Sequence, residues 1–219
     1  MSTLRTLAAG TLFSGAAALT PLAQAAPAAA ANETLRFQVY LDDKPIGEHT
    51  YRISGSGEQV RVSSRAEFDV DFLFINAYRY RHRSQEVFRD GCLEEIRAST
   101  DDNGTRYEVT GEAAGERFRI QRDDGTEQAK GCVMTFAYWD PDFLDQSRLL
   151  NPQTGELERV QVSRKGRDRI EVGGREVPAE RYVVDAGEVT IDLWYNEDLG
   201  WVGLSSDTGK GRRIIYRRL

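Results

Sequence analysis

The residues able to perform acid–base chemistry are few, because the sequence contains only two histidines, His49 and His82. His82 alternates with Ser84 and Glu86 along an extended stretch, so the three side chains share one strand face. Serine, histidine and a carboxylate are the groups of a hydrolase triad. Residues two apart on a strand lie about 6.6 Å apart, too far for the direct hydrogen bonds of a triad. We therefore expect His82 to be bonded within a β face, and an exported hydrolase using His82 or His49 is the alternative.

Metal and cofactor motifs are missing from the sequence. His49, His82 and Glu86 would have to converge from separate strands to hold a metal ion, and no closely spaced ligand pair supports such a site. No Gly-x-Ser-x-Gly elbow, phosphate-binding glycine-rich loop or dinucleotide fingerprint is present. We therefore expect no metal, no cofactor and no recognisable catalytic residue, and we favour a protein that is not an enzyme.

Aromatic rings with polar tips mark the candidate ligand site. Tyr78, Tyr80 and His82 share one face of residues 78–88, and a dry core would have to satisfy each hydroxyl and ring nitrogen. The apolar run from Phe72 to Ile75 breaks the alternation, which indicates a bend or an exposed rim. Ordinary core packing is the alternative for each residue. The expected site, for a lipid-like or other apolar ligand, consists of Tyr78, Tyr80, His82, Phe72, Phe74, Trp194 and Trp201.

Charge makes nucleic acid an unexpected partner, because the formal net charge is −6 and phosphate binding needs a clustered basic surface. Arg79, Arg81 and Arg83 do alternate on one strand face. Glu67, Asp69 and Asp71 shortly precede them, so we expect cross-strand ion pairs there. A strip that meets lipid headgroups or acidic polymers is the alternative. The expected partner is a lipid-like small molecule or an envelope protein, and the sequence does not indicate the oligomeric state.

The N-terminus has the pattern of an export signal. Arg5 is the only charge before Glu33, and an apolar run from Leu7 ends in the small-x-small sequence Ala23-Gln24-Ala25. We expect residues 1–25 to be a removed signal peptide and residues 26–219 to form a single antiparallel β domain. Since no later run reaches the ~18 apolar residues of a membrane span, we expect a soluble protein in the periplasm or outside the cell.

Cys92 and Cys132 are the only cysteines, an even pair in a chain expected to reach an oxidising compartment. That favours a disulfide, and two buried thiols are the alternative. A redox role is disfavoured, because the pair is not in a Cys-x-x-Cys arrangement and no histidine is near either in sequence.

Short turns between alternating stretches predict antiparallel strands along most of the chain. Examples are the turns at Asp42-Asp43-Lys44-Pro45, Arg89-Asp90-Gly91 and Asp102-Asn103-Gly104. The C-terminal part reads as four consecutive strands at 181–184, 189–195, 201–204 and 212–216.

One stretch, residues 139–146, could be helical, because Asp140 can cap and Pro141 can occupy the first helical position. We expect an all-β domain of about ten to twelve antiparallel strands in a meander, curved into an open barrel or a two-layer sheet, with at most one short helix.

Several short motifs resemble a known bacterial family. They are Val39-Tyr40-Leu41-Asp42-Asp43-Lys44-Pro45-Ile46-Gly47-Glu48-His49, Arg89-Asp90-Gly91-Cys92-Leu93, Asp192-Leu193-Trp194-Tyr195 and Trp201-Val202. They make the chain similar to the exported family called domain of unknown function 6134 and, more loosely, to its relative numbered 3108. The likeness covers nearly all of the chain after the export signal and implies a mostly antiparallel β fold.

The resemblance brings no established activity, cofactor or catalytic residue, so the functional expectation depends on the residues alone. We expect an exported, non-enzymatic envelope protein that binds a lipid-like or other apolar ligand, or a protein partner.

Overall fold

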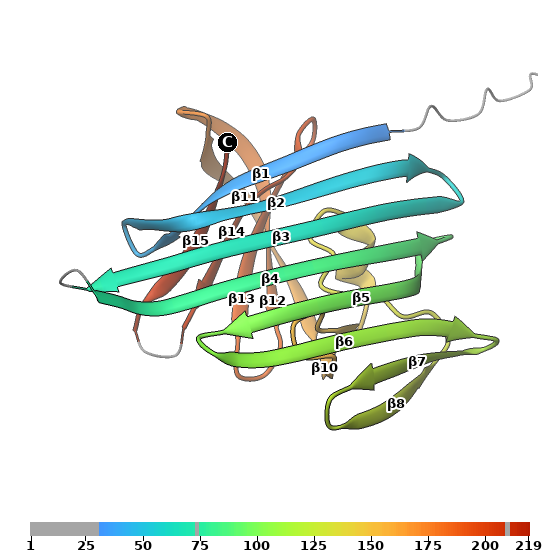
Figure 1. Ribbon diagram of the computed structural model, residues 1–219. Coiled ribbons are helices and arrows are strands. Elements are labelled where there is room, and N and C mark those ends of the chain that lie inside the picture. Colours follow the sequence, from blue (N-terminus) through green and yellow to red (C-terminus); the bar gives the residue numbers. More distant parts are fainter. Residues whose placement is uncertain (1–30, 73–74, 209–210) are drawn as a thin grey trace, which may run out of the picture.

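The computed structural model describes residues 31–72, 75–208 and 211–219 (Figure 1). The expected signal peptide, 1–25, lies outside these ranges. Within them, thirteen of the fifteen strands form one antiparallel sheet, in the order β11-β12-β13-β14-β15-β1-β2-β3-β4-β5-β6-β7-β8. The fold class is therefore as expected. Fifteen strands exceed the expected number partly because β9 and β10 have three residues each, too few to show an alternating pattern.

The N-terminal half is a broad curved sheet, which we call the wing. Three of its turns form where Asp42, Asp90 and Asn103 adopt positive φ angles of 55°, 50° and 51°, at turns expected from the sequence. The strands of the wing are β1 Ala31–Leu41, β2 Lys44–Ser56, β3 Gln59–Phe72, β4 Ile75–Arg89, β5 Cys92–Asp102, β6 Thr105–Ala114, β7 Arg117–Arg122 and β8 Gly125–Lys130.

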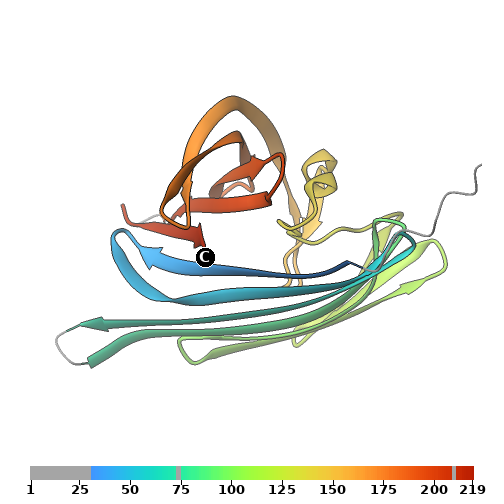
Figure 2. The same ribbon diagram turned by 90° about the horizontal axis from the view of Figure 1, so that it is seen from above.

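The C-terminal half forms a second meander, which we call the roll, and it lies over the concave face of the wing (Figure 2). Its last four strands are the four expected from the sequence. β15 pairs with β1, so the two halves share one sheet, but the end strands β8 and β11 do not pair and the sheet stays open. The strands of the roll are β11 Gln161–Val172, β12 Arg175–Asp185, β13 Thr190–Asn196, β14 Gly200–Asp207 and β15 Arg213–Arg218.

Residues 131–160, which we call the crossing segment, connect β8 to β11 above the wing (Figure 2). They contain the 3-10 helix η1 (Pro141–Asp145) and the short strands β9 (Arg148–Leu150) and β10 (Leu157–Arg159). The Asp140 carboxylate accepts the Asp142 N–H at 3.1 Å, so the expected cap is confirmed. No helix in the described ranges is both long enough and apolar enough to cross a membrane.

The expected disulfide is also confirmed. Cys92 and Cys132 are bonded and tie the beginning of β5 to the beginning of the crossing segment. The backbone N–H of Leu93 donates to the Val133 carbonyl at 2.8 Å beside the bridge. The crossing segment is therefore fixed to the wing covalently at one end.

The alternation read from the sequence decides which side chains face the roll. Val62, Ala66 and Phe68 of β3 are buried on the concave face. On the opposite face, Asp69 pairs with Arg81 at 2.7 Å and with Arg79 at 3.5 Å. The expected cross-strand ion pairs of the arginine strip are therefore present.

A close backbone contact holds β2 against β3 beneath the concave face. Gly47 has a φ of +152°, and a Cβ there would lie 1.9 Å from the Glu67 carbonyl oxygen. Only glycine combines this φ with so close an approach. A larger residue at this position would push β3 away and displace the concave face on which the site is built.

Candidate ligand-binding cavity

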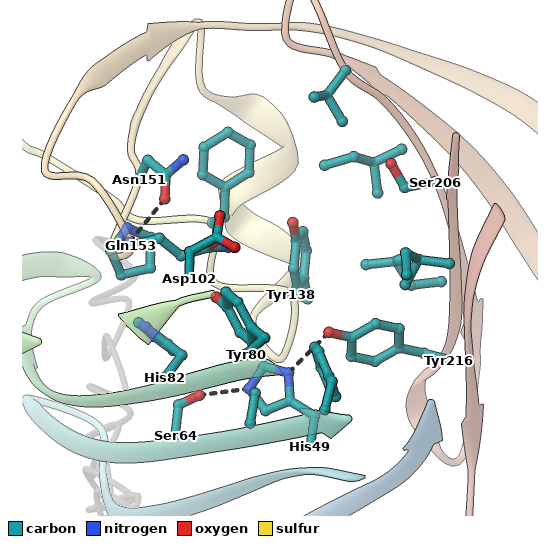
Figure 3. Close-up of a pocket in the computed structure, with 18 of the residues that line it drawn as sticks. His49, Ser64, Tyr80, His82, Asp102, Tyr138, Asn151, Gln153, Ser206 and Tyr216 are labelled. Atoms are coloured by element: carbon teal, nitrogen blue, oxygen red, sulfur yellow. Dashed lines mark hydrogen bonds between the residues drawn. The ribbon is translucent and has the colours of Figure 1, made fainter. Parts of the chain in front are cut away.

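A cavity of about 880 Å³ lies between the wing, the roll and the crossing segment (Figure 3). Its floor is the concave face of β2, β3 and β4, and its roof includes Ile191, Leu204 and Ile214 of the roll. Tyr138 of the crossing segment forms part of one side. The exposed lining residue Val189 marks a place where the cavity reaches the surface.

Small side chains hollow the floor. His49 on β2 and His82 on β4 both pair with Ala66 on β3, so the two imidazoles flank one methyl group. Two residues before Ala66, on the same face of β3, Ser64 pairs with Ser84 of β4. Because large side chains surround these small ones on the buried face, space remains above them. The cavity therefore follows directly from the residue sizes on β3 and β4.

His49 sits in a polar network on the floor. Its Nε2 lies 2.6 Å from the Ser64 Oγ, and its Nδ1 lies 3.2 Å from the Tyr216 hydroxyl (Figure 3). Burial lowers the pKa of His49 well below its usual value, so the ring is neutral at neutral pH. A neutral ring has one donor and one acceptor nitrogen, so Ser64 and Tyr216 take complementary roles.

His82 presents an acceptor to the cavity. Its Nδ1 lies 2.9 Å from the Thr100 Oγ1, and the Thr100 hydroxyl donates to the Gln153 carbonyl at 3.2 Å. In the tautomer that keeps the Thr100 proton on the Gln153 carbonyl, His82 Nδ1–H donates to Thr100 and Nε2 is the acceptor. Burial lowers the pKa of His82 to about 4, in keeping with a neutral ring.

Glu86 is a buried carboxyl group at the end of the floor. It accepts hydrogen bonds from Ser84 at 2.6 Å and from Thr135 of the crossing segment at 2.8 Å. Burial raises its pKa although both hydrogen bonds oppose that shift.

The inference that residues two apart cannot bond directly is wrong for Ser84 and Glu86. The glutamate side chain is long enough to lean along the strand, so its carboxylate reaches the serine. His82 takes no part in this pair, because its Nδ1 bonds to Thr100. These three residues of β4 therefore form no triad.

Two tyrosine hydroxyls face the cavity without a protein partner. Among the described residues, the hydroxyls of Tyr80 and Tyr138 make no hydrogen bond. Neither hydroxyl is fully buried, because Ser205 Oγ is the one fully buried side-chain polar atom without a partner there. The two hydroxyls therefore keep access to the cavity, into which Figure 3 shows both rings pointing. Burial raises the pKa of Tyr80 and of Tyr138 well above the usual value, so both remain protonated donors.

The structure brings together only part of the expected ligand site. Tyr78, Tyr80 and His82 line the cavity. Phe74 lies outside the described residues, and of Phe72 only the backbone in β3 is described.

The two expected tryptophans do not line the cavity. Trp201 is 1% exposed and lies behind the wall, with its ring 4.1 Å from that of Phe37. Trp194 faces away from the cavity, where its Nε1 donates to Asp168 at 2.9 Å. A register shift between β13 and β14 at Trp194 separates the environments of the two residues, and simple alternation could not reveal it.

Several lining residues were not identified from the sequence. Ser64 carried a usable signal, because it and Ala66 are small residues between the larger Val62 and Phe68 on the same strand face. The residues of the crossing segment and of β15 carried no such signal in the sequence, because only long-range packing brings them to the cavity. The missed lining residues include Ser64, Asp102, Thr135, Tyr138 and Tyr216, and Thr100, which bonds to His82, was missed as well.

Comparison with solved structures supports the fold. The chain is similar to a crystal structure described as a beta-barrel-like protein of domain of unknown function DUF1849 from Brucella abortus, with a TM-score of 0.62. The two are 10% identical, and the match covers 86% of this chain and 95% of that chain. No curated protein matches the sequence.

A family model confirms the resemblance expected from the sequence. It matches residues 37–219, which is most of the chain. This protein belongs to the family described as a domain of unknown function, DUF6134.

Proposed function

We propose that this protein is a non-enzymatic binding protein of the bacterial cell envelope that holds an amphipathic, lipid-like molecule in its cavity. The observation that carries the proposal is a cavity of about 880 Å³ with an apolar roof and a polar floor. That volume falls in the range of roughly 300–1,000 Å³ typical of small-molecule sites. The export pattern of the N-terminus and the Cys92–Cys132 disulfide support the envelope location.

The lining suits a molecule with two unlike ends. Ile191, Leu204 and Ile214 offer aliphatic surface from the roll. Opposite them, His82 and the Tyr80 hydroxyl offer hydrogen-bonding groups on the floor. An apolar chain against the roof and a polar end over these groups would satisfy both walls.

Cavity-filling substitutions test the proposal. Ala66→Phe places a ring between the two floor histidines, and Ser206→Phe places a ring in the cavity from the roof. We expect the parent protein to bind the neutral apolar dye Nile red, and each variant to lose at least about tenfold in affinity, equal to ~1.4 kcal/mol. Thr110→Phe, on the exposed face of β6, is the matched control and should bind like the parent.

Far-UV circular dichroism and thermal melting establish that each variant is folded. A parent protein that does not bind Nile red would contradict the proposal. So would folded forms of both cavity-filling variants that bind the dye as tightly as the parent.

The second candidate is a hydrolase with Ser64 as nucleophile, favoured by the 2.6 Å contact between its Oγ and His49 Nε2. Two features weigh against it. The other ring nitrogen faces the Tyr216 hydroxyl rather than a carboxylate, and burial lowers the pKa of His49, which makes it a weak base. Hydrolysis of p-nitrophenyl esters by the parent and its loss in Ser64→Ala would favour this candidate over binding alone.

A further inference from the structure

We infer that the cavity selects amphipathic molecules whose polar end is an uncharged hydroxyl group, and that it rejects those ending in a carboxylate or another anion. The inference rests on the proposed function and deepens it by naming the class of ligand. Its basis is the set of charges and unpaired hydrogen-bonding atoms on the lining.

The described lining offers an anion no free cation. Arg212 is the only lysine or arginine among the lining residues that the structure describes. It is exposed at the rim, and its guanidinium bonds to the Asp42 carboxylate at 2.9 Å. The remaining bases are His49 and His82, whose rings are buried, hydrogen-bonded and neutral. An anionic end would therefore lose its hydration without gaining an ion pair.

Carboxyl groups line the same space. Glu86, Asp102 and Glu158 all face the cavity, which would repel a second carboxylate. Each already has a protein partner: Ser84 and Thr135 donate to Glu86, the Asn151 amide donates to Glu158 at 2.7 Å, and Tyr78 bonds to Asp102. A cationic end would therefore compete with existing hydrogen bonds rather than fill an empty place.

Among the described lining residues, the polar atoms without a protein partner include His82 Nε2 and the hydroxyls of Tyr80 and Tyr138. The first is an acceptor only, in the tautomer in which Nδ1 holds the ring proton. The other two can donate. The Tyr80 and His82 rings lie 6.4 Å apart, centroid to centroid, which places their polar tips on one part of the lining (Figure 3).

A hydroxyl group matches this set, because it can donate to His82 Nε2 and accept from a tyrosine at the same time. A carboxylate has no proton to donate, so one of its lone pairs would face the lone pair of Nε2. The unpaired atoms therefore distinguish an alcohol from an acid of the same length.

Three matched probes test the inference. Each is a pyrene-labelled alkyl chain of one length, and they end in a hydroxyl, a carboxylate or a trimethylammonium group. At neutral pH we expect the alcohol to bind at least about tenfold more tightly than the other two, because an unpaired buried charge is costly. Fluorescence titration of the purified full chain measures the three dissociation constants.

Matched tyrosine variants locate the polar end. Tyr80→Phe and Tyr138→Phe each remove one hydroxyl and keep the ring, so we expect each to weaken alcohol binding by about three- to tenfold. Tyr40→Phe, on the opposite face of the sheet, is the control and should leave binding unchanged.

The outcomes separate the inference from the proposed function. Carboxylate or ammonium binding as tight as alcohol binding overturns the inference alone. If none of the three probes binds but Nile red does, the inference is overturned and the proposed function stands. Failure of all three probes together with Nile red overturns the proposed function and the inference with it.

Discussion

The wing and the roll are both antiparallel meanders, yet they present different surfaces to the cavity. The wing contributes buried polar groups, with His49 and His82 in one cross-strand row. The roll contributes mainly aliphatic side chains such as Ile191 and Leu204. Each meander follows the same alternation of strand faces, so the difference arises from which residue types occupy the inward positions.

This difference shows how an open sheet can carry buried polar groups. The polar floor is tolerated because nearly every group on it has a hydrogen-bond partner or contact with the cavity. The roll and the crossing segment lie over the floor. The wing therefore contributes much of the polar lining of the cavity, and the roll contributes much of its aliphatic lining.

The seam between wing and roll should show the largest effect of a single substitution. Trp201 of the roll packs against Phe37 and Tyr51 of the wing, so Trp201→Ala removes contacts across both halves. We expect a loss of about 3–5 kcal/mol in the free energy of unfolding. Urea denaturation followed by circular dichroism measures it.

Trp194→Ala is the matched comparison on the outer side of the roll. It loses a hydrogen bond to Asp168 and the Arg181 guanidinium stacked 5.6 Å from the ring centroid, and should cost only about 1 kcal/mol. Equal losses at the two tryptophans would contradict the assignment of Trp201 to the seam.

The disulfide tests how firmly the crossing segment is held to the wing. The bond closes a loop with a sequence separation of 40 residues. The double substitution Cys92→Ala with Cys132→Ala should lower the free energy of unfolding by up to about 4 kcal/mol, mainly by freeing the unfolded chain. The urea midpoint of the double variant, compared with that of the oxidised parent, measures the loss. An unchanged midpoint would show that the bridge does not stabilise this attachment.

The buried histidines make the wing sensitive to acid. The folded-state pKa of His82, about 4, is below the ordinary value of about 6.5, so between these values only the unfolded chain binds the proton. This contribution to stability is complete above about pH 6.5 and is lost as pH falls toward 4, by on the order of 3 kcal/mol. His49 acts in the same direction. Glu86 opposes them, because its raised pKa favours folding as pH falls through it.

His82→Gln checks the size of this effect. Urea titrations across the acidic range should give a shallower dependence of stability on pH for the variant than for the parent. Parallel curves would mean that His82 does not titrate between its folded and unfolded values as proposed.

Local patterns predicted much of the fold. The turns at Asp42, Asp90 and Asn103 were identified because few residues adopt positive φ readily. The alternation in β4 identified Tyr80 and His82 as inward-facing. These features depend on neighbours in sequence, so the sequence reveals them directly.

The assembly of the site could not be read in the same way. The pairing of β15 with β1 brings Tyr216 to His49, which lies 167 positions away in the chain. The crossing segment brings Thr135 to Glu86 in a similar manner. Such contacts depend on how the sheet curves and which halves meet, and no local periodicity encodes either.

Native mass spectrometry of the protein purified from the cells that naturally produce it tests the central claim most directly. We predict a complex with an uncharged amphipathic molecule that carries a hydroxyl group, and loss of that molecule in a folded Ala66→Phe variant. Protein that carries no small molecule, or a bound molecule retained equally by the folded Ala66→Phe variant, would contradict the account.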